Sequence, residues 1–322
     1  MLISAAAILI GLLLLFWGAD RFVVAAGATA RNLGVSPILI GLVIIGFATS
    51  APEMLISAVA SLEGAAGLAV GNALGSNIAN LGLVLGSAIL IFPLSIHSQT
   101  LRREFPAVLA ATGLTLLLLL DNEINRIDAV ILLTALGIFV FWITVLGSRS
   151  SVLDPIRAEY DAQIPAGIPA GKATFWLVVG LVTLLGGAEL MVAGATNIAT
   201  LMGVSDLVLG VTVVAVSTSF PELAVAVAAA LKGEPGLVLG NVLGSHIFNL
   251  LAVIGIAAGI QPQRLDAEVL TLHFPVMGAL TLIVFILAYN RRAAVQLTRP
   301  VGGGLLAAFF IYQGFVVWKS LS

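Results

Sequence analysis

Long apolar stretches separated by short polar segments run through the whole chain. Most of them contain about 20 or more residues, which is the length that a helix needs to cross the hydrocarbon core of a bilayer. The pattern predicts ten membrane-spanning helices, at about residues 2–30, 36–62, 67–91, 104–120, 127–147, 173–200, 205–231, 236–260, 267–289 and 300–320. The longest polar stretch, 148–172, is expected to link a first half, residues 1–147, to a second half, residues 173–322.

The second half repeats the first at a constant distance of 169 residues. GVSPILIGLVIIGFATSAPE (34–53) matches GVSDLVLGVTVVAVSTSFPE (203–222) at eight of 20 positions, and GNALGSNIAN (71–80) matches GNVLGSHIFN (240–249) at seven of 10. Because each half has an odd number of spans, the second copy crosses the membrane upside down relative to the first. The sequence therefore predicts an all-α polytopic membrane protein with ten transmembrane helices in two inverted five-helix repeats.

Composition and charge narrow the class of protein further. The chain is 60% hydrophobic and 9% charged, whereas a soluble domain has about 25% charged residues. A net charge of −2 gives no reason to expect a nucleic-acid partner. The absence of cysteine excludes disulfides, thiolate metal sites and cysteine nucleophiles.

Lysine and arginine are unequally divided between the two sides that ten spans define. The side of both termini collects three, namely Arg126, Arg264 and Lys319. The opposite side collects ten, namely Arg31, Arg102, Arg103, Arg149, Arg157, Lys172, Lys232, Arg291, Arg292 and Arg299. Arg21 lies within the first predicted span and is left out of this comparison. Because cytoplasmic loops carry an excess of these residues, we expect the linker 148–172 to be cytoplasmic and both termini to face outward.

Each repeat places a glutamate, Glu53 or Glu222, inside an apolar stretch. A carboxylate in hydrocarbon is costly and marks a functional site by default. Two of them at equivalent repeat positions indicate one shared site on a pseudo-two-fold axis. Thr49 and Ser50 precede the first glutamate, and Thr49 shares a helix face with it. The second repeat has the same residues, as Thr218, Ser219 and Glu222.

A proline stands immediately before each glutamate. Pro52 and Pro221 cannot donate the usual helical hydrogen bond, so each kinks its helix and frees a carbonyl four residues earlier. Backbone carbonyls near 46–49 and 215–218 are thereby available as ligands.

The following span of each repeat adds hydroxyl and amide groups. Ser76 and Asn80 are four residues apart, as are Ser245 and Asn249, so each pair lies on one helix face. The candidate ligands are thus carboxylate, hydroxyl, amide and carbonyl oxygens. Hard oxygen ligands suit Ca²⁺, Na⁺ or Mg²⁺ and suit zinc or copper poorly.

Single polar residues in a membrane helix usually have structural roles. Serine and threonine bond their own helix backbone, proline kinks a helix, and a glutamate can form a structural ion pair. Packing alone does not require the same two polar clusters twice in register, so the repetition favours an ion site. His246 follows Ser245, but adjacent helix residues do not face each other, which argues against a Ser–His hydrolase. No enzyme is expected.

The two repeated windows resemble the alpha repeats of the cation/Ca²⁺ exchanger superfamily, specifically its prokaryotic sodium/calcium exchanger branch. The resemblance covers essentially the whole chain. It implies that Ca²⁺ is bound by both glutamates and by the backbone carbonyls of the two motif threonines, here Glu53, Glu222, Thr49 and Thr218. It implies Na⁺ sites that add serine hydroxyls and earlier carbonyls, here Ser50, Ser219, Ser76, Ser245, Gly46 and Ala215. Asn80 matches a central polar position.

The chain departs from the family pattern at Asn249, where several members have aspartate. The site then holds two carboxylates, a charge of −2 that one Ca²⁺ or two Na⁺ would neutralise. Exchange of three Na⁺ for one Ca²⁺ is implied by the resemblance and not by this charge. His246 replaces a commoner asparagine of the family.

The sequence favours Na⁺/Ca²⁺ antiport by alternating access at the middle of the bilayer. Two relatives of the same superfamily remain as alternatives, an H⁺/Ca²⁺ antiporter and a K⁺-dependent Na⁺/Ca²⁺ exchanger, and a cation channel is the alternative from another class. The expected partners are Ca²⁺, Na⁺ and the lipids of a prokaryotic inner membrane. No cofactor and no obligatory protein partner are expected.

Overall fold

Almost all of the described chain is helical, as the apolar pattern predicts. The computed structural model describes residues 2–33, 40–62, 66–96, 98–149, 168–201, 218–288 and 295–321. The helices of the first half are α1 (Leu2–Leu33), the π-helical turn η1 (Gly41–Ile45), α3 (Gly46–Thr49), α4 (Ala51–Leu62), α5 (Ala66–Ala79), the π-helical turn η2 (Asn80–Val84), α6 (Leu85–Ile91), α7 (Ser98–Leu119) and α8 (Arg126–Arg149). Those of the second half are α10 (Ala170–Leu201), α13 (Phe220–Leu231), α14 (Pro235–Phe248), the π-helical turn η4 (Asn249–Val253), α15 (Ile254–Ile260), the π-helical turn η5 (Val269–His273), α16 (Phe274–Ala288) and α17 (Arg299–Leu321).

Helices occur in all ten ranges that the sequence predicts to be spans. Seven of the described helices are long and apolar enough to cross a membrane, and the bent pair Gly41–Thr49 and Ala51–Leu62 makes an eighth if it is one span. Two shorter apolar helices, Glu104–Leu119 and Phe220–Leu231, lie in the fourth and seventh predicted spans. Part of the seventh span lies outside the described residues, so the count of ten stays a prediction.

The helix boundaries repeat at the same distance as the sequence. Adding 169 to the bounds of α4 and α5 gives those of α13 and α14, and adding it to η2 and α6 gives those of η4 and α15. Each half therefore contains a short helix followed by a longer one that passes through a π-helical turn. The constant offset confirms that the repeated sequence specifies a repeated structure.

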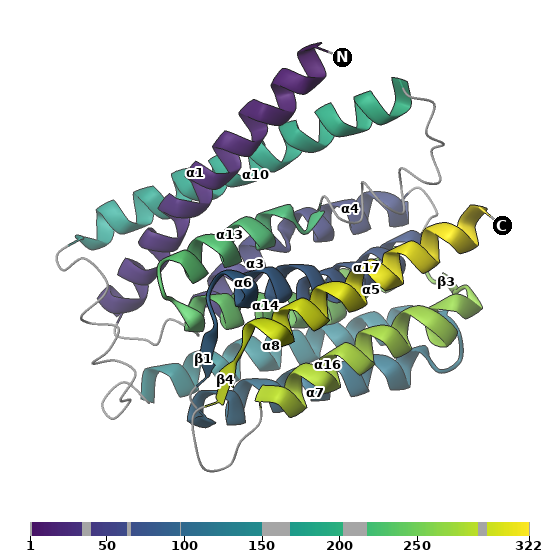
Figure 1. Cartoon of the computed structure of the whole chain (residues 1–322). Coiled ribbons are helices and arrows are strands. Elements are labelled where there is room, and N and C mark those ends of the chain that lie inside the picture. The colour runs from purple at the N-terminus through teal and green to yellow at the C-terminus, as the bar shows by residue number, and fades with distance from the viewer. Residues whose placement is uncertain are drawn as a thin grey trace.

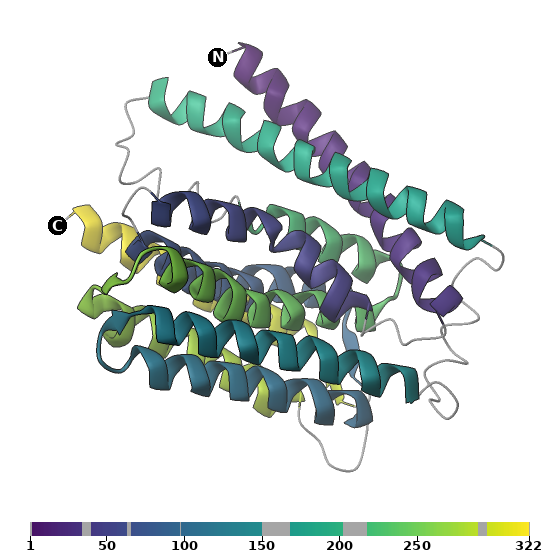
Figure 2. The same cartoon turned by 180° about the vertical axis from the view of Figure 1, so that it is seen from behind.

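α1 and α10 pack against each other along one side of the bundle (Figures 1 and 2). Glycines allow their backbones to approach closely. A Cβ atom on Gly18 would lie 2.6 Å from the backbone nitrogen of Leu184, and one on Gly187 would lie 2.6 Å from that of Leu15. Each contact maps onto the other when 169 is added, so the two helices cross symmetrically.

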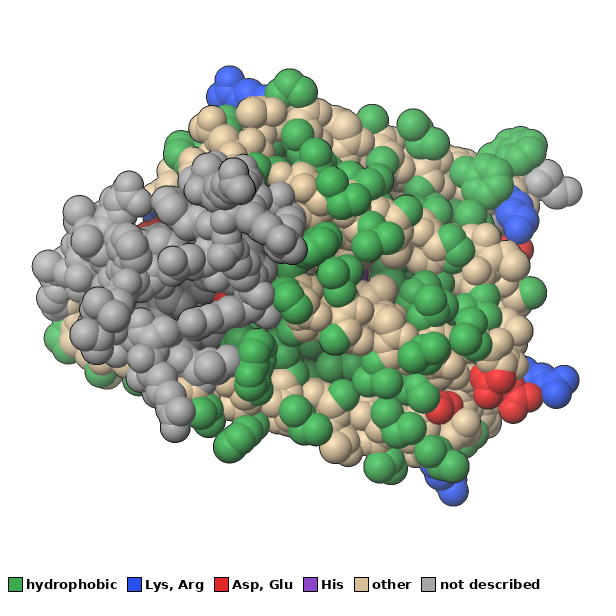
Figure 3. Space-filling model, turned by 90° about the horizontal axis from the view of Figure 1, so that it is seen from below, with side chains coloured by type: hydrophobic (Ala, Val, Ile, Leu, Met, Phe, Trp, Pro, Cys, Tyr) green, Lys and Arg blue, Asp and Glu red, His purple; other side chains and the backbone are tan. Residues whose placement is uncertain are grey.

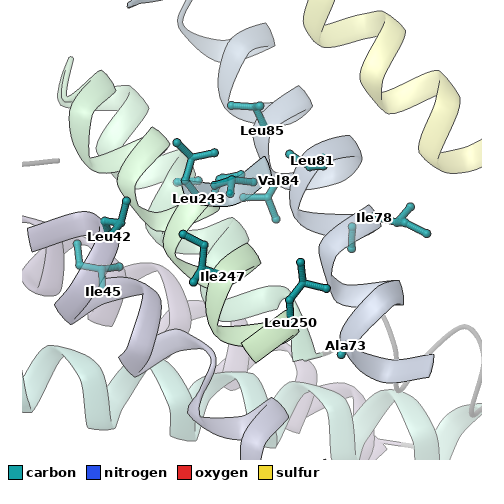
Figure 4. Close-up of a cluster of buried hydrophobic side chains, with 14 of the residues drawn as sticks. Leu42, Ile45, Ala73, Ile78, Leu81, Val84, Leu85, Leu243, Ile247 and Leu250 are labelled. Carbon is teal, nitrogen blue, oxygen red and sulfur yellow. The ribbon is translucent and has the colours of Figure 1, made fainter. Parts of the chain in front are cut away.

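The second repeat supplies the helix at the centre of the bundle. In the apolar segment Pro235–Ile260, which joins α14, η4 and α15, every residue from Leu237 to Gly255 is buried, whereas only 17% of the residues in the most apolar part of α17 are buried. Leu243, Ile247 and Leu250 of this segment face side chains of η1 on one side and of α5, η2 and α6 on the other (Figure 4). This apolar contact surface joins the two repeats.

Two short antiparallel sheets, which the all-α prediction did not include, join connections between helices. β1 (Leu94–Ile96) pairs with β4 (Val295–Leu297), and β2 (Glu123–Ile124) pairs with β3 (Gln263–Arg264). The two sheets lie toward opposite ends of the bundle (Figure 1).

Charged and apolar side chains occupy different parts of the described surface. Arg264 pairs with Glu123 at 2.8 Å, and Lys319 pairs with Glu268 at 2.7 Å, both at the end of the bundle that carries β2 and β3. Large apolar side chains such as Phe141, with 71% of its surface exposed, cover the flanks. Figure 3 shows this apolar middle, with charged groups at its edges. An exposed apolar belt between charged ends is what a lipid bilayer requires.

Candidate ion-binding site

The first polar motif lies at a break between two short helices. α3 ends at Thr49, Ser50 adopts φ −81° and ψ 0°, and α4 begins one residue later, at an angle of 44°. Pro52 accounts for the break, because it has no N–H to donate to the carbonyl of Ala48. Glu53 therefore lies in the first turn of α4, where the partial positive charge of the helix N-terminus favours a carboxylate.

The second motif has the same geometry. Ser219 adopts φ −88° and ψ 2°, α13 begins at the next residue, and Pro221 lies in its first turn. Glu222 occupies the same position in α13 that Glu53 occupies in α4. Both carboxylates are fully buried. The sequence thus builds two half-helices whose N-terminal turns each carry one glutamate into the protein.

The π-helical turns begin at the two asparagines that the sequence singles out. Asn80 is the first residue of η2, and Asn249 is the first residue of η4. A π-helical turn inserts an extra residue and is frequently found at functional sites. Both asparagine side chains are fully buried, as are those of Ser76 and Ser245 one turn earlier.

Hydrogen bonds between the repeats bring the two motifs together. Thr49 Oγ1 lies 3.2 Å from Ser245 Oγ, and Thr218 Oγ1 lies 3.3 Å from Ser76 Oγ. Because 49 and 218 differ by 169, as do 76 and 245, these are the same contact made twice. The Thr-Ser-x-Pro-Glu motif of each half thus meets the Gly-Ser motif of the other half.

The two glutamates share this polar centre. Ser245 Oγ donates to Glu222 Oε1 at 3.4 Å, and the carboxylates of Glu53 and Glu222 are close enough for their charges to repel each other. Several buried oxygens of the motifs have no hydrogen-bond donor among the described residues: both carboxylate oxygens of Glu53, Oε2 of Glu222, the hydroxyls of Ser50 and Ser219, and the amide oxygens of Asn80 and Asn249. Buried acceptors without donors, around two like charges, are the environment that a hard cation stabilises.

The backbone carbonyls of Gly46 and Ala215 are the two predicted ligands that precede the motif threonines. The Gly46 carbonyl accepts the Ser50 N–H at 3.1 Å, so the kink does not free it, although a carbonyl oxygen keeps a second lone pair. Ala215 lies outside the described residues. Gly46 also lies against α14, since a Cβ atom there would be 2.8 Å from the Cα of Gly244.

Two buried asparagines that the sequence analysis did not select also belong to this centre. Asn241 Oδ1 lies 3.2 Å from Thr49 Oγ1, and Asn241 Nδ2 donates to the backbone carbonyl of Glu222 at 3.1 Å. Asn77 Oδ1 accepts a hydrogen bond from Asn249 Nδ2 at 3.1 Å. The repeat could have identified Asn241, because the dipeptide Gly-Asn occurs in both copies, with Asn72 in the first and Asn241 in the second. Nothing in the sequence distinguishes Asn77, whose repeat counterpart is a histidine.

His246 is excluded from a Ser–His dyad by the structure as well. Its Nε2 atom lies 3.4 Å from Thr112 Oγ1 of α7, whereas Ser245 Oγ faces Thr49 and Glu222. The part of the chain that the structure describes contains no group of three or more His, Asp or Glu side chains that could hold a metal ion. The centre is therefore built from two carboxylates and neutral oxygens.

Comparison with known proteins decides the family. The sodium/calcium exchanger protein family model matches residues 3–145 and 172–318, which is nearly all of both halves. The chain belongs to the sodium/calcium exchanger family. The resemblance of the two repeated windows is thereby confirmed. The residues between the two matched segments are almost the same as the predicted linker.

Relatives of this exchanger cover almost its entire length. It is 42% identical to the putative antiporter CaxA of Alkalimonas amylolytica, over 97% of this chain and 98% of that protein. It is 33% identical to the sodium/calcium exchanger MaX1 of Methanosarcina acetivorans, over 87% of this chain and 89% of that one. Its structure matches that of the sodium-calcium exchanger NCX_Mj with a TM-score of 0.82 and 31% identity, over 96% of this chain and 97% of the other. The chain is thus a membrane protein of a cation/Ca²⁺ exchanger family.

Proposed function

We propose that this exchanger is a Na⁺/Ca²⁺ antiporter in which both ions compete for the oxygen-lined centre between the two repeats. The observation that carries the proposal is the pair of symmetric contacts, Thr49 with Ser245 and Thr218 with Ser76. These contacts support one buried site that two glutamates from opposite halves share. The names of MaX1 and NCX_Mj, both sodium/calcium exchangers, support Na⁺ as the coupling ion.

The proposed ligands are the residues that the sequence analysis selected. Ca²⁺ would be held by the two carboxylates and the carbonyls of the motif threonines, and Na⁺ would use the hydroxyls, amides and earlier carbonyls as well. The full set is Glu53, Glu222, Thr49, Thr218, Ser50, Ser219, Ser76, Ser245, Asn80, Asn249, Gly46 and Ala215. The bend between α3 and α4, together with the helix boundary just before Pro221, supports a site near the middle of the bilayer, where broken helices bind ions in other transporters.

The charge of the site supplies the coupling. Two ionised carboxylates without a cation carry a charge of −2, and exposing that charge to apolar surroundings is strongly unfavourable. One Ca²⁺ or two Na⁺ neutralise it, so only the loaded site crosses between the two sides. This alternating access makes the protein an exchanger rather than a channel. In the proposed orientation, in a prokaryotic inner membrane, the linker 148–172 is cytoplasmic and both termini are outside.

Flux measurements in proteoliposomes test the proposal directly. Purified protein is reconstituted, and Ca²⁺ uptake is followed under an outward gradient of Na⁺, of H⁺ or of K⁺, with the membrane potential clamped. We expect uptake that requires the Na⁺ gradient and proceeds without K⁺. Uptake driven by H⁺ alone would identify an H⁺/Ca²⁺ antiporter, and a requirement for K⁺ would identify the K⁺-dependent type. Ca²⁺ flux without any counter-ion would identify a channel.

A further inference from the structure

The side chain of Asn77 connects Asn249 to the backbone of the second repeat. Asn77 Nδ2 donates to the backbone carbonyl of His246 at 3.3 Å and lies 3.6 Å from Met277 Sδ. Asn77 Oδ1 accepts from Asn249 Nδ2 at 3.1 Å. Asn77 and Asn249 are fully buried, so water does not compete for these bonds. Asn249, Asn77 and the backbone carbonyl of His246 thus form a short chain of hydrogen bonds beside the proposed ion site.

The backbone carbonyl fixes the direction of this chain. A carbonyl can only accept, so the atom of Asn77 that faces His246 must be its amide nitrogen. Asn77 Oδ1 then faces Asn249, and the Asn249 atom that faces Asn77 must also be a nitrogen. The oxygen of Asn249 consequently points away from Asn77, where it has no donor among the described residues.

The first repeat lacks this arrangement. Asn80 is the counterpart of Asn249, and His246 is the counterpart of Asn77. The His246 imidazole is directed to Thr112 of α7, and both amide atoms of Asn80 are buried without a hydrogen-bond partner in the described part of the chain. The two asparagines therefore differ, because only Asn249 has its amide orientation fixed by protein hydrogen bonds.

We infer that Asn77 is a positioning residue that holds the oxygen of Asn249 toward the transported ion. This inference rests on the proposed function, because it assigns Asn249 to the ion site. The fixed bond also explains why an amide serves at this position. An ionised carboxylate at position 249 would place one of its oxygens against Asn77 Oδ1, and the two acceptors would repel each other. If the Asn77 amide turned over to donate to that carboxylate, Asn77 Oδ1 would instead lie against the carbonyl oxygen of His246. A neutral donor that also offers an oxygen meets both requirements.

A double-mutant cycle separates positioning from structural support. Ca²⁺ affinity is measured by calorimetric titration of the purified protein, together with the half-saturating Ca²⁺ concentration and maximal rate of Na⁺-driven uptake. The variants are Asn77→Leu, Asn249→Leu and the double variant. Asn77→Ala, which brings no branched side chain into the space, is the second variant if leucine impairs folding. Met277→Leu is the matched control, because it removes the weaker contact of the Asn77 nitrogen and keeps the apolar packing.

We expect Asn77→Leu and Asn77→Ala to weaken Ca²⁺ binding and raise the half-saturating concentration about 10-fold, the effect of losing one well-placed ligand. Adding the Asn77 change to Asn249→Leu should cause no further loss, and Met277→Leu should bind as the native protein does. Native affinity in the Asn77 variants, or additive losses in the double variant, would overturn the inference. Because binding is measured separately, absent Na⁺-driven uptake by the native protein would refute the proposed function without affecting this test.

Discussion

The two buried glutamates allow a prediction in which ion binding and protein stability change in opposite directions. Glu53→Gln and Glu222→Gln each keep the size of the side chain and remove one of the two site charges. The ion then loses one formal charge among its ligands. Without the ion, the repulsion between the two carboxylates is also lost. If the site binds cations, each variant should therefore be more stable than the native protein without the ion, and it should bind Ca²⁺ much more weakly.

The size of the binding loss follows from the depth of the site. Two unit charges 4 Å apart interact by about 4 kcal/mol at an effective dielectric constant of about 20. A divalent ion doubles this attraction, and the hydration that both groups give up opposes the increase, so we take about 4 kcal/mol as the net loss. Since about 1.4 kcal/mol is a factor of ten, Ca²⁺ affinity should fall about 1,000-fold.

Thermal unfolding in detergent, with and without Ca²⁺, measures both effects. Ca²⁺ at 100 times its native dissociation constant stabilises the native protein by about 2.7 kcal/mol, and it would stabilise a variant that binds 1,000-fold more weakly by only about 0.1 kcal/mol. Na⁺-driven Ca²⁺ uptake should be abolished in both variants. Glu268→Gln is the control, because this carboxylate pairs with Lys319 at the surface, away from the site. Near-native Ca²⁺ stabilisation or exchange in either glutamine variant would refute the shared site.

Three further predictions address packing, pH and orientation. Gly244→Ala places a Cβ atom against the backbone carbonyl of η1 and should destabilise the fold by about 1–3 kcal/mol, whereas Gly278→Ala, which meets no described atom within 4 Å, should not. Burial raises the pKa of Glu234, between α13 and α14, to about 7. The folded state then holds this proton more tightly than the unfolded chain, so stability should fall from about pH 5 to pH 7, and Glu234→Gln should remove that part of the fall. A cysteine at Ser150 should react with an impermeant thiol reagent only from the cytoplasmic side, and one at Asp121 only from outside; reversed labelling would mean that the orientation is wrong.

Local sequence was sufficient to predict the helices and the two polar motifs. Apolar length and the positions of proline depend only on neighbours along the chain, and helices occur in every range that was predicted to span the membrane. Pro52 and Pro221 were expected to break their helices, and helix boundaries are found immediately before both. The repeat extended this prediction to the second half of the chain, because adding 169 to the residue numbers of the first motif gives the position of the second motif.

Contacts between helices could not be predicted in the same way. The spacing of Ser76 and Asn80 shows that they share a helix face, but it does not identify the residue opposite that face. The bond from Ser76 to Thr218 crosses 142 residues of chain, and the bond from Asn249 to Asn77 crosses 172. The strand pairs were missed for a related reason, since strands of two or three residues have too little sequence to show an alternating pattern.

The neutrality of the surrounding amides is as important to the proposed mechanism as the charge of the glutamates. Asn77, Asn80, Asn241 and Asn249 all lie buried at the centre and add oxygen atoms without adding charge. Each ionised carboxylate in their place would make the empty site more negative and would require another cation before the site could cross. With two carboxylates, one Ca²⁺ and two Na⁺ are equivalent in charge, so either ion can complete the cycle that the other begins. We expect the exchange of one ion for the other to depend on this equality, and therefore on the amides that maintain it.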